Sequence, residues 1–185
     1  ALRKRIGFVF QQYNLFPHLS VLDNITLAPT RILGVERSTA EREAKELLER
    51  VRLSDKVDAY PGQLSGGQQQ RVAIARALVT EPELVICDEI TSALDVVVQK
   101  RIMDLLMGLR DTTGLSYLFV THNIALVSDI ADRVLVLKSG RIEESGETGR
   151  VLRHPQSRYV QDLVAYTPTL DAAGGAGSAN DGAAR

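Results

Sequence analysis

The sequence has a single cysteine and almost no net charge. One cysteine, Cys87, in 185 residues excludes an internal disulfide framework and fits a reducing compartment. The formal net charge of −1 excludes a global field that favours nucleic acid or an anionic membrane. No apolar run approaches the roughly 20 residues needed to span a bilayer. No signal peptide is visible either, because ALRKRIGFVFQQ has no sustained apolar region after its charges.

Two further features are missing. The sequence contains no GxxxxGK[ST] loop, the usual cradle for nucleotide phosphates. It also begins without methionine, inside a segment that looks like a strand, and we therefore expect a truncated chain. What is present is typical of a soluble globular protein: 44% hydrophobic and 24% charged residues, in a length sufficient for one domain with a core.

The pattern of apolar residues predicts a mainly helical segment between residues 20 and 80, followed by alternating strands and helices. The predicted strands are 6–10, 84–89, 117–122 and 133–140, and the predicted helices are 20–28, 38–51, 64–78, 96–110, 123–133 and 158–166. Because strands and helices alternate after residue 84, we expect right-handed βαβ units and a parallel sheet.

Local signals fix several boundaries. Ser20 is expected to open the first helix and Pro29 to end it or lie just past it, and Ser38 with Glu41 has the form of a capping box. Gly140 is expected to supply the positive φ of a hairpin turn. The residues from about 171 onward are too small and polar to pack, and we expect them to be disordered.

The segment LSGGQQQRVAIARAL, residues 64–78, places Ser65, Gly66 and Gly67 at the head of a predicted helix. A helix N-terminus attracts anions through its backbone N–H groups, and two glycines allow another group to approach the backbone closely. A phosphate is the natural anion. Alternatively, Ser65 and Gln68 form a capping box that serves the helix alone, although such a box does not require two glycines.

LVICDE, residues 84–89, ends a predicted strand with two adjacent carboxylates, Asp88 and Glu89. Ligands of open α/β sheets bind at the carboxyl ends of the strands. In that place Asp88 can help to hold Mg²⁺, and Glu89 can act as general base for an attacking water. The alternative is that both carboxylates merely end a strand in solvent.

Two other predicted strands also lead into polar residues. His122 follows YLFVT and can hydrogen-bond a γ-phosphate, while Gln11 follows FVF and can ligate Mg²⁺ or orient water. Taken singly, each has a simpler explanation, because His122 can be satisfied by a neighbouring backbone group and Gln11 can be a solvated loop residue. TSALD, residues 91–95, is by itself only a helix-capping turn.

Together these segments carry more information than each alone. FVFQQ, LSGGQQQR, LVICDEITSALD and VTH, in this order and spacing, closely resemble the nucleotide-binding subunits of ABC transporters over roughly residues 1–165. The resemblance implies an α/β fold: a P-loop NTPase (RecA-like) core with a parallel sheet, plus an ABC-type helical subdomain, with the N-terminal part missing. It also implies ATP as the nucleotide, Mg²⁺ as the metal and ATP hydrolysis as the reaction of the complete protein.

The resemblance assigns roles to particular residues. Gln11 is similar to the Q-loop glutamine and Asp88 to the Walker B aspartate, which together imply the metal site. Glu89 resembles the catalytic glutamate and His122 the switch histidine. The residues implied to contact nucleotide are those of the signature motif and the D-loop, namely Leu64, Ser65, Gly66, Gly67, Gln68 and Asp95.

The sequence departs from the family pattern at two places. Ile90 stands where the family usually has proline, which we expect to change loop stiffness more than chemistry. The adenine-stacking aromatic residue and the Walker A loop with its lysine are expected before residue 1, so the truncated chain alone is expected to be inactive. The expected divisions are a strand with the Q-loop at 1–12, a helical subdomain at 13–80, the RecA-like core at 81–150, a helical extension at 151–170 and a disordered tail at 171–185.

The resemblance also implies partners. In the family two such subunits dimerise head to tail, so that the signature motif of one faces the phosphate loop of the other. Transmembrane permease subunits and, indirectly, an extracytoplasmic substrate-binding protein complete a bacterial importer, with this subunit peripheral at the cytoplasmic face and no nucleic acid involved. Residues 10–34 and 58–71 look like importers of polar amino acids, whereas residues 86–99 and 154–168 look like oligopeptide importers. We favour amino-acid import.

Two alternatives remain. A soluble ABC ATPase of DNA repair or translation usually carries long coiled-coil insertions or tandem cassettes, and neither is visible in this sequence. A non-catalytic, truncated cassette that only binds partners fits the lack of a Walker A loop. A GxxxxGK[ST] segment in frame upstream of Ala1 would decide between an enzyme and a remnant.

Overall fold

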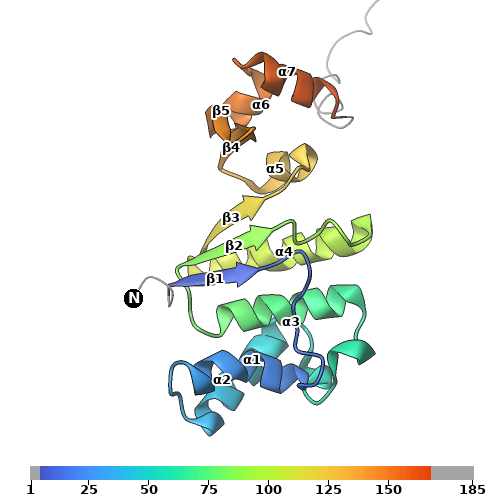
Figure 1. The fold of residues 1–185 in the computed structure, drawn as a ribbon, viewed down its shortest axis with the longest axis vertical. Coiled ribbons are helices and arrows are strands. Elements are labelled where there is room, and N and C mark those ends of the chain that lie inside the picture. Colours follow the sequence, from blue (N-terminus) through green and yellow to red (C-terminus); the bar gives the residue numbers. More distant parts are fainter. Residues whose placement is uncertain (1–4, 168–185) are drawn as a thin grey trace, which may run out of the picture. The chain divides into compact units, whose positions relative to one another are not determined.

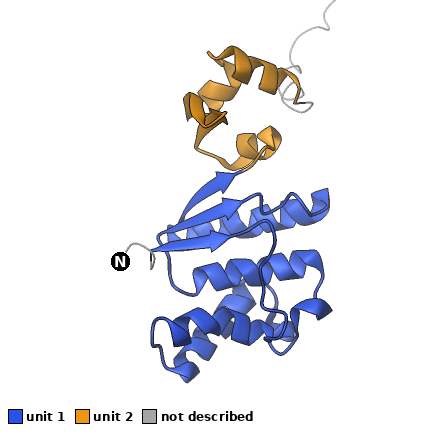
Figure 2. Ribbon diagram, viewed as in Figure 1, with its two compact units in different colours: residues 1–120 blue, residues 121–185 orange. Residues whose placement is uncertain are grey.

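A computed structural model of the chain describes residues 5–167. The chain divides into two compact units, Ala1–Val120 and Thr121–Arg185, coloured separately in Figure 2. Within the described residues, no helix is both long enough and apolar enough to cross a membrane.

The first unit contains a three-stranded parallel sheet (Figure 1). Its strands are β1 (Ile6–Val9), β2 (Leu84–Asp88) and β3 (Ser116–Val120), in the order β1-β2-β3. The sequence-based prediction of a parallel sheet from these three segments is confirmed. The central strand β2 has a parallel partner on both sides, and its side chains Val85 and Cys87 are buried.

Three helices form a second layer of the first unit. They are α1 (Val21–Arg31), α2 (Arg37–Arg50) and α3 (Gly66–Leu78), with short 3₁₀ turns at Ser54–Lys56 and Pro61–Gln63. Helix α3 contacts β1 as well as α1 and α2, and thereby joins the sheet to the other helices (Figure 1). The core among the helices comprises Val21, Ile25, Ala44, Leu48, Val51, Leu53, Leu64, Val72, Ala75 and Val79.

Asn24 fixes the loop that leads into α1. It is 1% exposed, its Oδ1 accepts from the Phe16 amide at 2.8 Å, and its Nδ2 donates to the carbonyls of Phe16, Leu19 and Ser20 at 2.9–3.1 Å. Ser20 caps α1 as predicted, because its Oγ accepts from the Asp23 amide at 3.0 Å. One buried amide therefore holds the whole turn from Phe16 to Ser20.

Two predicted helix boundaries were wrong. Pro29 lies inside α1, which continues to Arg31. Helix α2 begins at Arg37 with Glu36 as its N-cap, whose carboxylate accepts from the Thr39 amide at 3.2 Å. Ser38 is the second residue of the helix, where its hydroxyl donates to that same carboxylate, so it does not cap the helix. An anionic cap is favourable here because it faces the positive end of the helix dipole.

Helix α4 (Val96–Thr113) connects β2 to β3 and ends at Gly114, whose φ of 68° is the left-handed conformation favoured at helix C-termini. Its buried face consists of Ile102, Met103, Leu106 and Leu109. These residues are three or four positions apart, as expected for a helix that packs on one side.

The second unit contains a β-hairpin and three short helices. Strands β4 (Arg133–Lys138) and β5 (Arg141–Glu147) pair antiparallel, and the helices are α5 (Ile124–Ile130), α6 (Thr148–Arg153) and α7 (Arg158–Ala165). The predicted turn is confirmed, since Ser139 and Gly140 both have positive φ, 49° and 76°. The inclusion of residues 133–140 in the parallel sheet was wrong, because a two-residue turn brings the next strand back beside β4. The tail predicted to be disordered lies outside the described residues.

Candidate functional site

The start of helix α3 is a capping box, as the sequence predicts. Ser65 is the N-cap, its Oγ accepts from the Gln68 amide at 3.4 Å, and the Gln68 Oε1 accepts from the Ser65 amide at 2.8 Å. The amides of Gly66 and Gly67 occupy the first two helical positions, where no intrahelical carbonyl can reach them. Leu64 is 7% exposed and belongs to the core, so of the predicted nucleotide contacts it is the most enclosed.

Both glycines of this motif are closely approached by side chains of the same chain. A Cβ on Gly66 would lie 2.7 Å from the Tyr13 hydroxyl oxygen and 3.6 Å from Leu94. A Cβ on Gly67 would lie 2.7 Å from Val98 Cγ1, at the start of α4. The sequence indicated a close approach at these glycines without identifying the neighbours. The neighbours in this structure come from the segment after Gln11 and from the segment after Glu89.

The carboxylates of the second motif lie at the carboxyl end of the central strand. Asp88 ends β2 and Glu89 follows it, and both are partly buried. Glu89 has a φ of 46°, its amide donates to the Val120 carbonyl at 2.9 Å, and its carbonyl accepts from the amide and Oγ of Ser92 at 3.1 and 2.9 Å. A non-glycine residue in the left-handed region is held there by such surrounding bonds, and is common at functional sites.

Two buried side chains border these carboxylates. Cys87 is 0% exposed, and its burial raises the pKa of the thiol to about 12, so it is neutral and unreactive at neutral pH. Ile90 is 4% exposed, so its apolar side chain is buried. It stands at the position where the family that this sequence resembles usually has proline.

Asp95 caps helix α4, with its Oδ1 accepting from the Val98 amide at 3.0 Å. The preceding turn is tied to the same helix, because Gln99 Nε2 donates to the carbonyls of Thr91 and Leu94 at 2.8 and 3.0 Å. The simpler explanation of TSALD as a capping turn is therefore correct for the described chain, and the predicted nucleotide contact of Asp95 remains a prediction.

Gln11 is exposed two residues beyond the end of β1. Because β1 and β2 are parallel neighbours with Val9 opposite Cys87, Gln11 lies at the same sheet edge as Asp88 and Glu89. The donor set of one carboxylate and one amide oxygen fits Mg²⁺, which prefers oxygen ligands and is usually held by one or two carboxylates together with substrate phosphates. No cluster of three or more His, Cys, Asp or Glu side chains suited to a metal occurs in the part of the chain that the structure describes.

His122 belongs to the second unit, where it is exposed in the short segment between β3 and α5. The first unit thus contains Gln11, the signature segment and the two carboxylates, and the structure assigns His122 no position relative to them. Its role stays a prediction.

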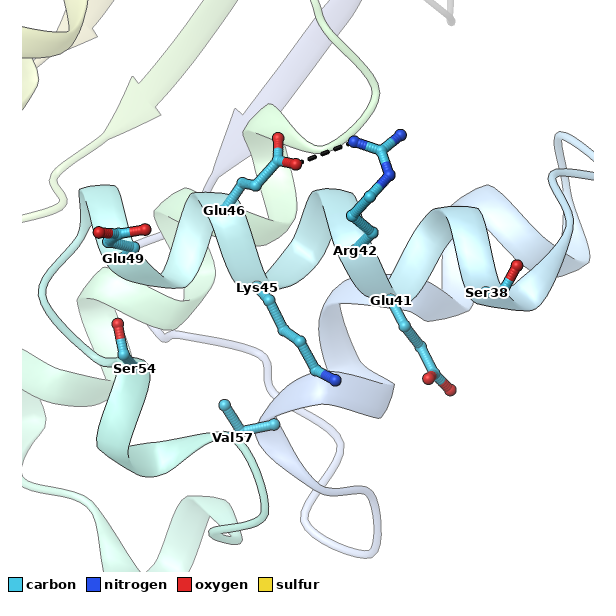
Figure 3. A pocket seen from close by; sticks show the side chains of 8 residues that line it. All are labelled: Ser38, Glu41, Arg42, Lys45, Glu46, Glu49, Ser54 and Val57. Atoms are coloured by element: carbon cyan, nitrogen blue, oxygen red, sulfur yellow. Dashed lines mark hydrogen bonds and ion pairs between the residues drawn. The ribbon is translucent and has the colours of Figure 1, made fainter.

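A surface cavity of about 600 Å³ lies elsewhere in the first unit, along α2 and the turn at Ser54–Lys56 (Figure 3). None of the predicted site residues lines it. Arg42 and Glu46 on its wall form an ion pair at 2.8 Å. Its lining residues are Ser38, Glu41, Arg42, Lys45, Glu46, Glu49, Ser54 and Val57. This cavity is a groove between charged surface residues, and we place no part of the site there.

Sequence reasoning missed several residues that shape the site. Arg76 donates to the carbonyls of Tyr13 and Asn14, and Gln69 donates to the carbonyls of Pro61 and Leu64. Gln70 is fully buried on α3, and neither of its amide atoms has a hydrogen-bond partner among the described residues. The only sequence signal for these contacts was the glycine pair, which predicts a close neighbour but does not identify it.

Comparison with known proteins gives one consistent result. The family model described as ABC transporter matches residues 1–92. The glutamate transport ATP-binding protein GluA of Corynebacterium glutamicum is 44% identical over 88% of this chain and 67% of its own length. The glutamine transport ATP-binding protein GlnQ of Escherichia coli is 39% identical over 89% of this chain and 68% of its own length. The methionine import ATP-binding protein MetN of Corynebacterium jeikeium is 46% identical over 89% of this chain, which spans 44% of that relative.

Proposed function

Since the chain belongs to the ABC transporter family of ATP-binding proteins, we propose that it is part of the ATP-hydrolysing subunit of a bacterial importer of polar amino acids. The observation that carries this proposal is the pairing, in one unit, of a glycine-rich helix start with two carboxylates at the carboxyl end of a central parallel strand. The first offers backbone N–H groups to an anion, and the second offers oxygen ligands and a base.

Each site residue has a proposed part in hydrolysis. Asp88 and Gln11 would hold Mg²⁺, which when bound neutralises charge on the transferred phosphoryl group. Glu89 accepts the proton of the attacking water, and its fixed backbone keeps the carboxylate at the sheet edge. His122 donates a hydrogen bond to the γ-phosphate and stabilises developing charge.

The amides of Gly66 and Gly67, with Ser65 and Gln68 around them, face the nucleotide of a second ATP-binding subunit. Asp95 and the turn before it lie beside that contact, since Val98 packs on Gly67. A two-fold dimer makes this arrangement reciprocal, so each composite site takes its signature segment from one subunit and its phosphate loop from the other.

The remaining partners follow from the importer assignment. Permease subunits would anchor this subunit at the cytoplasmic face of the membrane, and an extracytoplasmic binding protein would deliver the cargo. Three relatives carry names that specify glutamate, glutamine and methionine, which supports an amino acid as cargo over an oligopeptide.

The test of the base uses Glu89. The 185 residues contain no GxxxxGK[ST] segment, so by themselves they should hydrolyse ATP only at background level. In a version with such a segment preceding residue 1, Glu89→Gln should bind ATP normally while turnover falls by about 10²–10⁴, because an amide cannot take the proton. Asp88→Asn is the contrasting variant and should instead raise the Mg²⁺ concentration needed for half-maximal activity. Near-normal hydrolysis by Glu89→Gln would mean that another residue is the base.

The test of the composite site uses Ser65. A cysteine placed there should cross-link to a cysteine in the partner's phosphate loop, and more efficiently with ATP present. Cross-links found only within one chain would contradict the head-to-tail dimer.

A further inference from the structure

Tyr13, two residues after Gln11, is held at both of its ends by helix α3. Its carbonyl accepts from Arg76 Nη2 at 3.0 Å, and its hydroxyl lies against Gly66 at the other end of the same helix, 2.7 Å from where a Cβ would be. Asn14 adds a second bond, because its carbonyl accepts from Arg76 Nη1 at 2.6 Å. One guanidinium thus donates hydrogen bonds to two consecutive carbonyls of the segment that carries Gln11, and this pair of bonds is the Arg76 grip.

The backbone at Asn14 makes this grip possible. Its φ of 49° is left-handed, a conformation that asparagine tolerates better than most residues. In an extended strand successive carbonyls point in opposite directions, whereas the turn at Asn14 directs both toward Arg76. Asparagine at position 14 and arginine at position 76 therefore belong to one arrangement.

The hydrogen bonds from Arg76 to these two carbonyls also compensate for the hydration that its charged group loses on burial. The side chain is partly buried, and burial lowers the pKa of its guanidinium, so the cation has lost part of its hydration. No ion pair of Arg76 occurs among the described residues, and the two carbonyls supply the compensation. A planar guanidinium can donate to two acceptors in a fixed geometry, which an ammonium group cannot do.

We propose that Arg76 is a positioning residue that fastens the Gln11 segment to helix α3. Gln11 and the Ser65–Gln68 segment thereby keep a fixed position relative to each other and move together. This inference rests on the proposed function for its catalytic consequence. Arg76 touches neither nucleotide nor metal; it acts by fixing Tyr13 between the two ends of α3. Loss of these hydrogen bonds leaves nucleotide binding intact. It allows the Ser65–Gln68 segment to move relative to the sheet edge that carries Gln11.

Arg71 is a matched control on the same helix. It is also partly buried and donates through Nη1 to two carbonyls, those of Val51 and Arg52, at 3.2 and 3.3 Å. These two partners follow the end of α2, and its Nε donates to the Gly67 carbonyl within α3 at 3.3 Å, so none of its partners belongs to the Gln11 segment. Arg71→Lys therefore removes comparable bonds from the same helix and leaves the bonds to Tyr13 and Asn14 in place.

The first experiment follows hydrogen–deuterium exchange in the 185-residue chain. Arg76→Lys should speed exchange of the amides in residues 11–16 roughly tenfold, as the loss of a charge-assisted hydrogen bond implies. Arg71→Lys should instead speed exchange around residues 51–53 and leave 11–16 unchanged. Equal acceleration of 11–16 in both variants, or none in Arg76→Lys, overturns the proposal.

A second pair of variants tests the same grip without altering Arg76. Asn14→Gly keeps access to positive φ and should preserve protection of residues 11–16, whereas Asn14→Val disfavours that conformation and should reproduce the Arg76→Lys pattern. If Asn14→Val leaves the segment protected, the carbonyl grip does not depend on this turn and the proposal is wrong.

The second experiment measures ATPase kinetics in the version that carries a GxxxxGK[ST] segment, assembled with its permease. Arg76→Lys should lower kcat about tenfold with KM for ATP changed less than twofold, and Asn14→Gly, which keeps the bonds to Arg76, should change neither. If exchange responds as expected but kcat does not, the positioning role is wrong while the proposed function stands. If the unaltered protein fails to hydrolyse ATP, the proposed function is wrong while the exchange result still decides the grip.

Discussion

The left-handed backbone at Glu89 predicts that glycine gives a more stable protein than alanine at this position. Glu89→Ala and Glu89→Gly both remove the carboxylate, so their difference isolates the backbone. A side chain with Cβ costs about 1–2 kcal/mol in the left-handed region, which glycine avoids, while glycine loses about 0.5–1 kcal/mol through the greater freedom of its unfolded chain. With a φ of 46° at position 89, we expect the glycine variant to be more stable than the alanine variant by about 0.5–1 kcal/mol.

The neighbouring residue provides a control with the opposite sign. Asp88 lies in strand β2, where glycine should be less stable than alanine by about 0.5–1 kcal/mol. Urea unfolding of the four variants, followed by far-ultraviolet circular dichroism at pH 7, measures both differences. If alanine is the more stable residue at position 89 as well as at position 88, the backbone of Glu89 is not left-handed, and the account of how its carboxylate is held fails.

Three further predictions concern closely packed or buried positions. Gly67→Ala should lower the free energy of unfolding by about 1–3 kcal/mol, because its Cβ would meet Val98 Cγ1 at 2.7 Å, and adding Val98→Ala should recover part of the loss. Gln70→Met should raise the free energy of unfolding by about 1 kcal/mol, because it removes a buried amide without a partner in the described chain; a decrease in urea unfolding would show that the amide is satisfied. Burial raises the pKa of Cys87 from about 9 to about 12, so the folded state disfavours the thiolate. The contribution of the neutral thiol to the free energy of unfolding should be fully present below pH 9 and should fall as pH rises from 9 toward 12, by up to about 1.4 kcal/mol per pH unit. Urea titrations between about pH 9 and 10.5 should therefore show a flatter decline in stability for Cys87→Ala than for the unaltered protein.

The parts of the fold that the sequence predicted are those set by neighbours in the chain. The start of α3 was predictable because Ser65 and Gln68 satisfy each other across three residues. Strand β2 was predictable because LVIC is continuously apolar. The start of α2 was not, because Glu36 and Ser38 are both able to accept from a helix amide, and the sequence pattern favours serine over the carboxylate that the structure uses.

Contacts between distant residues were not predictable. The bond from Arg76 to Tyr13 joins positions 63 residues apart, and nothing in the sequence around either residue specifies the other. The hairpin turn at Ser139 and Gly140 was predictable from the sequence, but the sheet to which residues 133–140 belong was not: alternation of strands and helices favours the parallel sheet, whereas β4 pairs with β5 in a separate one. The order of the motifs predicts which residues form the site, and that assignment stays a prediction, whereas the close packing of Gly66 and Gly67 could be learned only from the fold.

Asn24 has a consequence for the tolerance of this sequence to change. Its amide accepts one hydrogen bond and donates to three carbonyls, so it must present an oxygen and an NH₂ group at one fixed distance from the backbone. Aspartate lacks the donors, leucine lacks both groups, and glutamine places them one methylene farther away. In a library in which every position is randomised, position 24 should therefore accept almost no replacement, whereas its fully apolar neighbour Ile25 should accept other aliphatic residues of similar volume. A polar side chain inside this helix is thus a stricter constraint on sequence drift than the apolar core that surrounds it.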